Sequence, residues 1–298
     1  MNLRTSLLLQ ELGRRPLLCD GATGTQLQLL GLAPGACGEL WPVDHPERLQ
    51  QVHRAYLSAG ADLLTTNTFG GTSCVLAPHG AGGRVRELNV AAARLARQIA
   101  GDRAWVLGDV GPFGGMLEPF GEALPEDVAT AFREQIAALL EGGADAILVE
   151  TMSDPAEAVL AVEAAKAAGA GLVVATFTFQ QSPRGYRTML GTSAADALSA
   201  VIAAGADVVG ANCGTALSLT DYEKLSAELV ASAGGHPVIV QPNAGSPKLV
   251  DGKICYEESA AQFAEAAPRF LGAGARIVGG CCGSTPAHIA AMAALIKG

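Results

Sequence analysis

Short apolar runs alternate with longer helical patterns along the whole chain. Runs rich in Val, Ile, Leu and Ala are predicted to be strands, at residues 16–19, 63–66, 105–109, 146–150, 172–177, 208–212, 237–241 and 276–279. Segments with apolar residues at helical spacing separate or follow them, at residues 46–59, 85–100, 126–141, 155–168, 194–204, 219–233, 258–271 and 286–297. Because the strands read as continuous apolar runs, they are typical of parallel strands that are covered on both faces.

A short turn with glycine recurs between helices and strands. The sequence Gly-Ala-Asp stands at 60–62, 143–145 and 205–207, and Gly-Ala-Arg stands at 274–276. Glycine at such a place ends a helix and turns the chain toward the next strand. Eight strands, each followed by a helix, are the number found in a closed (β/α)8 barrel. We therefore predict an α/β fold, a single (β/α)8 TIM-type barrel with residues 1–298 as one domain. A doubly wound open sheet is the alternative.

Composition and charge narrow the classes of partner. The 298 residues carry a formal net charge of -9, which argues against binding to nucleic acid or to an anionic membrane. Residues 1–15 do not have the apolar core of a secretory signal, and no uncharged apolar segment approaches membrane-spanning length. Cysteines in such a chain are expected to stay reduced. The sequence thus predicts a cytoplasmic protein with neither nucleic-acid nor membrane partners.

Three cysteines follow two of the predicted strands. Cys213 ends one apolar run, and the adjacent pair Cys281 and Cys282 follows the last one, among glycines that free the backbone there. Three thiolates form an incomplete tetrahedral shell that suits zinc and leaves one position open. The alternatives are buried cysteines that only fill the core, and a disulfide between the two neighbours.

Polar residues follow other predicted strands at the same end of the barrel. Asp20 and Glu150 come after the first and fourth strands, and Asn67 and Asn243 after the second and seventh. The active sites of such barrels lie at the carboxyl ends of the strands. Two carboxylates there favour a site for a cationic group such as a substrate amine. The asparagines are more ambiguous, because asparagine also serves the turns at strand ends.

These strand-end segments resemble the motifs of a known family. The matching segments are DGATGT at 20–25, TNTFG at 66–70, GDVGP at 108–112, ETMSD at 150–154, NC at 212–213, PNAG at 242–245 and GGCCGSTP at 279–286. The GGCCG segment together with a separate Asn-Cys is highly specific. The chain resembles the homocysteine S-methyltransferase family, and within it most resembles the homocysteine-binding barrels of the cobalamin-dependent methionine synthase branch.

The resemblance implies a role for each candidate residue. By this resemblance, the zinc ligands of the chain, which would also be its catalytic residues, are the thiolates of Cys213, Cys281 and Cys282. The remaining four candidates would form the homocysteine site: Asp20, Glu150, Asn67 and Asn243. The two carboxylates would hold the substrate amino group, and the asparagine at 243 would offer an oxygen near the metal before substrate arrives.

The resemblance also implies the reaction. Homocysteine thiolate would attack the methyl group of a methylcorrinoid, methylcobalamin, held by a partner domain or protein, and methionine would form. The chain would then be either one domain of a larger synthase or an enzyme that meets a corrinoid protein. The rim segments 21–25, 34–41, 68–72, 111–119 and 243–248 are expected to meet the donor. Two alternatives are methyl transfer from S-methylmethionine or S-adenosylmethionine, and a non-catalytic zinc barrel that binds a thiol amino acid.

Overall fold

Eight parallel strands form a sheet that closes on itself. The structure is a computed structural model and describes residues 3–250 and 253–297. The strands are β1 (Leu17–Leu18), β2 (Leu63–Thr65), β3 (Trp105–Val110), β4 (Ala146–Met152), β5 (Val173–Phe177), β8 (Val208–Asn212), β9 (Val238–Gln241) and β12 (Ile277–Val278). Their order is β1-β12-β9-β8-β5-β4-β3-β2, and a parallel bridge between Cys19 and Leu63 joins the two ends. The predicted barrel is confirmed, and the open sheet is wrong.

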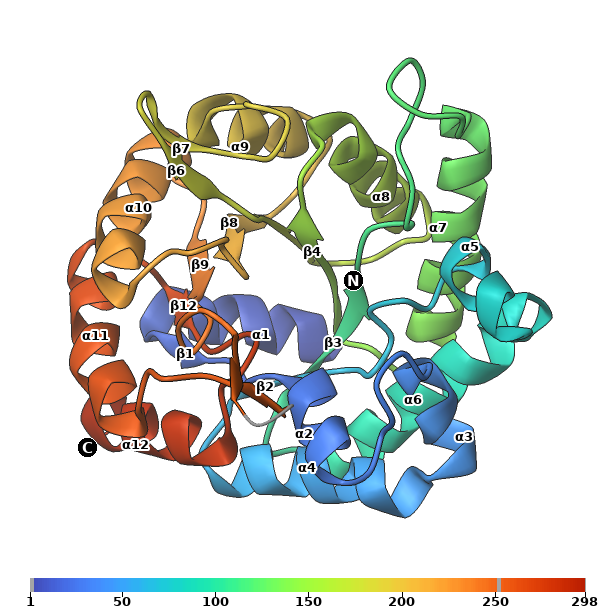
Figure 1. The fold of residues 1–298 in the computed structure, drawn as a ribbon, viewed down its shortest axis with the longest axis horizontal. Helices are drawn as coiled ribbons and strands as arrows, with labels where there is room; N and C mark the ends of the chain where they lie inside the picture. The colour runs from blue at the N-terminus through green and yellow to red at the C-terminus, as the bar shows by residue number, and fades with distance from the viewer. Residues whose placement is uncertain (1–2, 251–252, 298) are drawn as a thin grey trace.

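Helices surround the barrel on its outer side (Figure 1). The larger ones after the strands are α4 (Pro46–Ser58), α6 (Val85–Ala100), α7 (Pro125–Glu141), α8 (Pro155–Ala167), α9 (Ala194–Ala203), α10 (Leu219–Ser232), α11 (Ala260–Gly272) and α12 (Pro286–Ile296). Each lies within two residues of its predicted bounds. None of the helices in the described part of the chain combines the length and the hydropathy that a membrane span needs.

The glycine turns keep the helices and strands in register. Gly60, Gly143, Gly205 and Gly274 all have positive φ. The aspartate two residues after the first three of these glycines accepts a backbone N–H from a neighbouring strand, as in the 2.8 Å bond from Val106 N to Asp145 Oδ2. The turn therefore ends one helix and also fixes the next strand beside its neighbour.

An N-terminal helix, which the sequence pattern did not predict, closes one end of the barrel. Helix α1 (Leu3–Arg14) lies across the ring of strands (Figure 1). Its Leu8 and Leu12 are buried and join the inward-facing aliphatic side chains of the strands. Arg4 donates to Asp145 at 2.8 Å, and Arg276 donates to the Leu12 carbonyl at 2.6 Å. This end of the barrel is filled by apolar packing, so chemistry is left to the opposite end.

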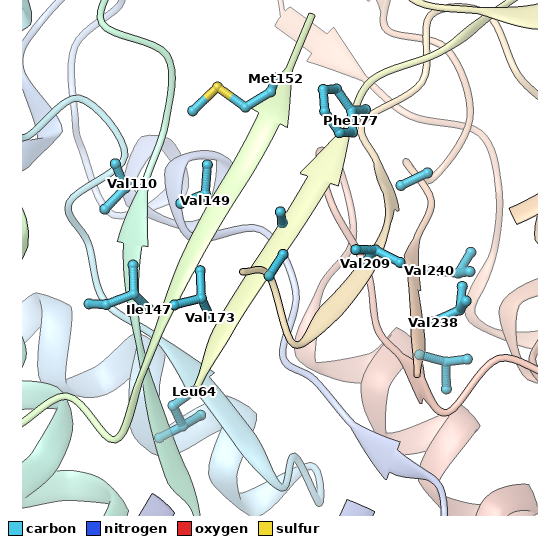
Figure 2. Close-up of a cluster of buried hydrophobic side chains, with 14 of the residues drawn as sticks. Leu64, Val110, Ile147, Val149, Met152, Val173, Phe177, Val209, Val238 and Val240 are labelled. Atoms are coloured by element: carbon cyan, nitrogen blue, oxygen red, sulfur yellow. The ribbon is translucent and has the colours of Figure 1, made fainter. Parts of the chain in front are cut away.

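Alternate residues on the strands face the surrounding helices. Figure 2 shows this outward-facing layer, which includes Ile147 and Val149 of β4, Val173 of β5 and Val209 of β8. The same strands place Leu148, Val174 and Val208 in the interior cluster, because successive strand residues point to opposite faces. Each strand is thus buried on both sides, and this explains its unbroken apolar run.

Other segments near the carboxyl ends of the strands were not predicted as regular structure. A short helix, α2 (Thr23–Leu29), begins inside the segment 21–25 that was expected to be a rim loop. The remaining elements here are α3 (Trp41–Asp44), α5 (Ser73–Leu76), three 3₁₀ turns (Gly38–Leu40, Ala77–His79, Gly82–Arg84), and the hairpins β6 (Gln180–Ser182) with β7 (Gly185–Arg187) and β10 (Lys248–Val250) with β11 (Lys253–Cys255).

Candidate metal centre and substrate cavity

The interior of the barrel changes from aliphatic to polar at the carboxyl ends of its strands. Side chains alternate between the two faces of a strand, so the residue two positions after an inward-facing aliphatic residue also faces the interior. For example, Leu107 is followed by Asp109, Leu148 by Glu150, and Ile239 by Gln241. The full polar layer of these strands is Thr65, Asp109, Glu150, Thr176, Asn212 and Gln241.

An open cavity of about 350 Å³ lies above this polar layer. Its lining includes four carboxyl groups and three thiols, from Asp20, Glu39, Asp109, Glu150, Cys213, Cys281 and Cys282. Residues 22–25 at the start of α2 and the 36–39 segment cover one side, and Phe69 adds an exposed ring. The predicted rim segments 21–25, 34–41 and 68–72 therefore contribute to this cavity.

The three cysteine sulfurs meet at one point of the cavity wall. They lie within 4.8 Å of one another, and the Sγ atoms of Cys213 and Cys282 are 3.5 Å apart. Three sulfurs on a tetrahedral zinc ion, with bonds of about 2.3 Å, would be about 3.8 Å apart. Cys281 and Cys282 are both free thiols rather than a vicinal disulfide. The donor set and its spacing therefore fit zinc, with room on the cavity side for a fourth ligand.

Local backbone geometry explains why neighbouring cysteines can converge. Strand β12 ends at Val278, so the pair lies in a turn rather than in a strand that would point the two side chains apart. Gly283 follows with φ of 79°, and a Cβ there would come within 2.1 Å of the Tyr256 ring. The Cys281 N–H donates to the Pro242 carbonyl at 2.8 Å. Glycine is therefore required where this turn folds under the ring.

Hydrogen bonds among the thiols favour one thiolate in the cluster. Bonds from Cys213 and Cys281 lower the pKa of Cys282 to about 3. Interactions with Cys213 and Cys282, together with burial, raise the pKa of Cys281 well above its usual value. The cluster thus holds negative charge at the sulfur of Cys282 while its neighbours act as donors. Such a site attracts a soft cation.

Asp20 is a buried carboxyl whose oxygens already have partners. Its side chain is 1 % exposed. Oδ2 accepts the backbone N–H of Thr65 at 2.8 Å, and Oδ1 accepts the Thr65 hydroxyl at 3.1 Å and the Cys19 thiol at 3.5 Å. Burial raises the pKa of Asp20 to about 7, against the effect of these donors. Asp20 faces the cavity as predicted, and it also ties β1 to β2.

Glu150 is joined to the cysteine cluster through Asn212. The Asn212 amide donates to Glu150 Oε2 at 2.8 Å and lies 3.8 Å from the Cys281 sulfur. Its Oδ1 accepts from the Thr151 N–H at 2.9 Å and from the Thr176 hydroxyl at 2.8 Å. Loss of solvent around Glu150, followed by the negative charge of Cys282, raises its pKa to about 7. Asn212 therefore holds the carboxyl beside the thiols.

The two other predicted site residues lie at different places. Asn67 lines the cavity and donates to the Gly38 carbonyl at 2.7 Å, so it attaches the 36–39 segment to β2. Asn243 is buried between the two loops that carry the cysteines. Its amide donates to the Gly214 carbonyl at 3.3 Å, and its Oδ1 has no partner among the described residues. Asn243 is not one of the described residues that line the cavity.

Sequence reasoning did not select Asp109 and Gln241 as site residues. Both belong to the polar layer, both line the cavity, and both are almost completely buried. The signal that identifies them is the period of two along the strand, counted from the inward-facing Leu107 and Ile239. Burial, followed by the charge of Glu150, raises the pKa of Asp109 well above its usual value.

Comparisons with known proteins identify the family of this chain. The profile of the homocysteine S-methyltransferase family matches residues 17–296. The methionine synthase of Mycobacterium tuberculosis is 35% identical to this chain over an alignment of 306 positions that covers 97% of the chain, and that of Mycobacterium leprae is 34% identical over an alignment of the same length. The chain spans 25% of the length of each of these two synthases.

A solved structure shows the same fold over nearly the whole chain. The metallated form of the homocysteine methyltransferase MmuM from Escherichia coli has a TM-score of 0.80 and 26% identity, with 98% of this chain and 99% of that chain covered. Its apo form has a TM-score of 0.72 and covers 94% of this chain and 95% of that chain. Residues 17–296, which the family profile matches, contain every strand of the barrel and all three clustered cysteines. This chain belongs to the homocysteine S-methyltransferase family.

Proposed function

We propose that this chain is a zinc-dependent methyltransferase that transfers a methyl group to the sulfur of homocysteine and forms methionine. The observation that carries the proposal is the convergence of three cysteine sulfurs within 4.8 Å on the wall of a cavity that is also lined by carboxyl groups. A soft metal site beside acceptors for an ammonium group matches a substrate that carries both a thiol and an amine.

The zinc ligands in this proposal are Cys213, Cys281 and Cys282. Zinc, when bound there, would hold the substrate sulfur as a thiolate at neutral pH, whereas a free thiol is only a few per cent ionised. Asn243 lies between the two loops that carry the cysteines, and its unpaired Oδ1 supports a role for this residue as an acceptor near the ion before substrate binds.

The homocysteine amino group is assigned to the carboxyl wall. Glu150 faces the cavity from β4, and its position is fixed by the 2.8 Å bond from Asn212. Asp20 faces the same space from the end of β1. Asn67 holds the covering segment at Gly38 and so limits the space around the substrate. Binding at both ends would orient the sulfur toward the open side of the cavity, where a donor can approach.

The chemical step needs only a nucleophile held in line with a methyl group. An electron pair on the homocysteine sulfur forms the new S–CH₃ bond, and the donor leaves with the electron pair of the broken bond. The proton of the homocysteine thiol is released before this step, because the thiolate is the nucleophile. The chain contributes the orientation of the thiolate, and the methyl transfer itself needs no general base because the proton has already left.

The donor we propose is a methylcorrinoid, methylcobalamin, held by a partner domain or protein. Identity of 35% to a methionine synthase over a quarter of that protein supports a partner outside this barrel. The cavity opens at the barrel mouth, which a donor on another protein can reach. We also assign the chain to the cytoplasm, because thiols stay reduced in that compartment.

A sulfonium donor is the second candidate, and one observation favours it. None of the described residues that line the cavity is Lys, Arg or His, while four of them are carboxyl groups. An acidic cavity attracts a cation, and both S-methylmethionine and S-adenosylmethionine carry a positive sulfur. The likeness to a homocysteine methyltransferase that matches over 99% of its own chain is compatible with a barrel acting alone.

One experiment separates these possibilities. The zinc-loaded chain is incubated with homocysteine and, in parallel, with free methylcobalamin, a methylated corrinoid protein, S-methylmethionine or S-adenosylmethionine, and methionine is measured over time. We expect slow turnover with free methylcobalamin and much faster turnover with the corrinoid protein, because docking positions the methyl group. The Cys282→Ala variant, tested with the same donors, should form no methionine.

Other outcomes decide against the proposal. Methionine from S-methylmethionine but not from either corrinoid donor would replace the methylcorrinoid assignment with the sulfonium one. Homocysteine binding without methionine from any of the four donors would favour the non-catalytic zinc barrel.

A further inference from the structure

One serine hydroxyl joins the cysteine turn to the helix that covers the cavity. Ser284 follows the two adjacent cysteines, and its side chain is completely buried. Its Oγ donates to the Cys281 carbonyl at 2.7 Å and accepts the Ala22 N–H at 3.1 Å. Ala22 immediately precedes α2, whose first turn lines the cavity. A single hydroxyl therefore bridges a candidate zinc ligand and a wall of the substrate cavity, which lie at opposite ends of the chain.

The backbone on both sides of this bridge leaves room for the hydroxyl. A Cβ at Gly21 would come within 2.5 Å of the Ser284 Oγ, and a Cβ at Gly280 would come within 2.4 Å of the same atom. Neither glycine has a positive φ. Glycine is therefore required at both positions by the close approach of Ser284 rather than by the local turn.

Helix α2 depends on its surroundings for its position. It has seven residues, and helices this short are not stable by themselves in water. The residue at its start, Ala22, has no side-chain oxygen to cap the helix, and its carbonyl accepts from the Tyr56 hydroxyl of α4 at 2.8 Å. Two polar atoms of α2, Thr25 Oγ1 and Gln26 Nε2, are buried without a partner among the described residues. Of the bonds at the start of α2, the one to Ser284 leads to the cysteines.

We propose that Ser284 is a positioning residue that couples the cysteine site to the cavity wall formed by α2. This inference rests on the zinc site of the proposed function. Ligation of Cys281 would restrict the turn 281–284, and with it the hydroxyl that holds the Ala22 N–H. Helix α2 is then fixed over the cavity when the metal site is filled. Homocysteine thus meets a complete cavity only where its sulfur can be ligated.

Hydrogen exchange measures this coupling, because α2 contributes no ligand to the cysteine cluster. The exchange of the backbone amides of residues 27–30 is followed by mass spectrometry in the wild type, loaded with zinc and after removal of zinc by a chelator. We expect zinc to slow this exchange about fivefold or more, as for one added hydrogen bond that holds the helix. Ser284→Ala should keep the wild-type zinc content and yet show the same exchange with and without zinc.

Two further variants separate coupling from simple loosening of the helix. Tyr56→Phe removes the hydroxyl that donates to the Ala22 carbonyl but leaves the Ser284 bond in place. The α2 amides should then exchange faster in both states, and zinc should still slow them. Ser259→Ala is the matched serine control, because Ser259 caps α11 and does not line the cavity. It should behave as the wild type does.

A second part of the cavity wall serves as an internal control. The segment 36–39 is held by the 2.7 Å bond from Asn67 to the Gly38 carbonyl and has no printed bond to Ser284. Its response to zinc should be the same in the wild type and in Ser284→Ala. A purely structural role of Ser284 would instead speed exchange to the same extent with and without zinc.

The outcomes that contradict the coupling differ from those that contradict the zinc site. Equal exchange of α2 in the wild type with and without zinc, or a zinc response that survives in Ser284→Ala, would overturn the coupling and leave the proposed function intact. Loss of zinc from Ser284→Ala would overturn it as well, because Ser284 would then hold the cysteines themselves. Failure of the wild type to bind zinc would overturn the proposed function and this inference together.

Discussion

Asn212 donates a 2.8 Å hydrogen bond to Glu150, and the residue that follows it in the chain is Cys213. One completely buried asparagine therefore connects a cavity carboxyl with a cysteine of the cluster. The side-chain Oδ1 of Asn212 accepts a hydrogen bond from the backbone N–H of Thr151, a residue with φ of 61°. A change at Asn212 would thus alter the carboxyl, the thiols and a strained strand end at the same time.

Replacing Asn212 tests this connection. Asn212→Ala should lower the free energy of unfolding by about 1–3 kcal/mol, because it leaves buried partners unpaired. Asn212→Asp keeps the oxygen that accepts from Thr151 and Thr176 but places a carboxylate against Glu150. It should retain more stability than the alanine variant and yet bind homocysteine more weakly than wild type. Urea denaturation and calorimetry measure the two effects; wild-type homocysteine affinity in both variants would contradict the connection.

Metal content tests the cysteine cluster. The chain purified without chelator should contain about one zinc ion per molecule, bound by three sulfurs. Alanine at 213, 281 or 282 should abolish zinc retention, while the far-ultraviolet circular dichroism of the barrel is unchanged, because the strands and helices hold the core. Cys74→Ala is the control, since this exposed cysteine lies outside the cluster. Full zinc occupancy in Cys282→Ala, measured by mass spectrometry of the metal, would exclude the assignment.

Substrate binding tests Glu150. Glu150→Gln keeps an oxygen that can accept from Asn212 but removes the negative charge, so homocysteine binding should weaken by roughly 1.5–3 kcal/mol. Zinc content should stay the same, since the side chain is not among the metal ligands. The Glu157→Gln variant, which changes a carboxyl outside the cavity, should bind homocysteine as the wild type does. Equal affinities in the two variants would leave Glu150 with a structural role only.

Stability at acid pH tests the buried histidine of α4. Burial lowers the pKa of His53 from 6.5 to about 4, and neither ring nitrogen has a partner among the described residues. The unfolded chain therefore binds a proton that the folded chain rejects between these values. The contribution of neutral His53 to the free energy of unfolding is fully present above pH 6.5 and is lost as the pH falls toward 4. The full loss of unfolding free energy is about 3 kcal/mol.

A substitution isolates this effect from other titrating groups. His53→Leu removes the proton site and keeps an apolar side chain in the buried position. Between pH 7.5 and pH 5 the wild type should lose more unfolding free energy than the variant, as measured by urea denaturation at both pH values. Equal losses would show that His53 is not the group responsible.

Much of this fold could be predicted from local pattern. The eight strands and the helices that follow them were placed within a few residues, because strands buried on both faces form unbroken apolar runs and glycine turns mark the helix ends. The adjacent Cys281 and Cys282 among glycines suggested a metal site for a similarly local reason. These features depend on residues close together in the chain, so one sequence is enough to find them.

Other features depended on which distant residues meet. Helix α1 has ordinary amphipathic character, and only its contacts from Leu8 and Leu12 to the strands show that it closes the barrel. The unpaired Oδ1 of Asp109 likewise could not be recognised from the sequence. It depends on the folded structure, in which Thr65 donates to Asp20 and Asn212 donates to Glu150. Local pattern was sufficient for the barrel strands, the helices that follow them and the reactive cysteines. Which polar atoms stay unpaired at the cavity depends on the folded arrangement, because hydrogen-bond partners come from strands far apart in the chain.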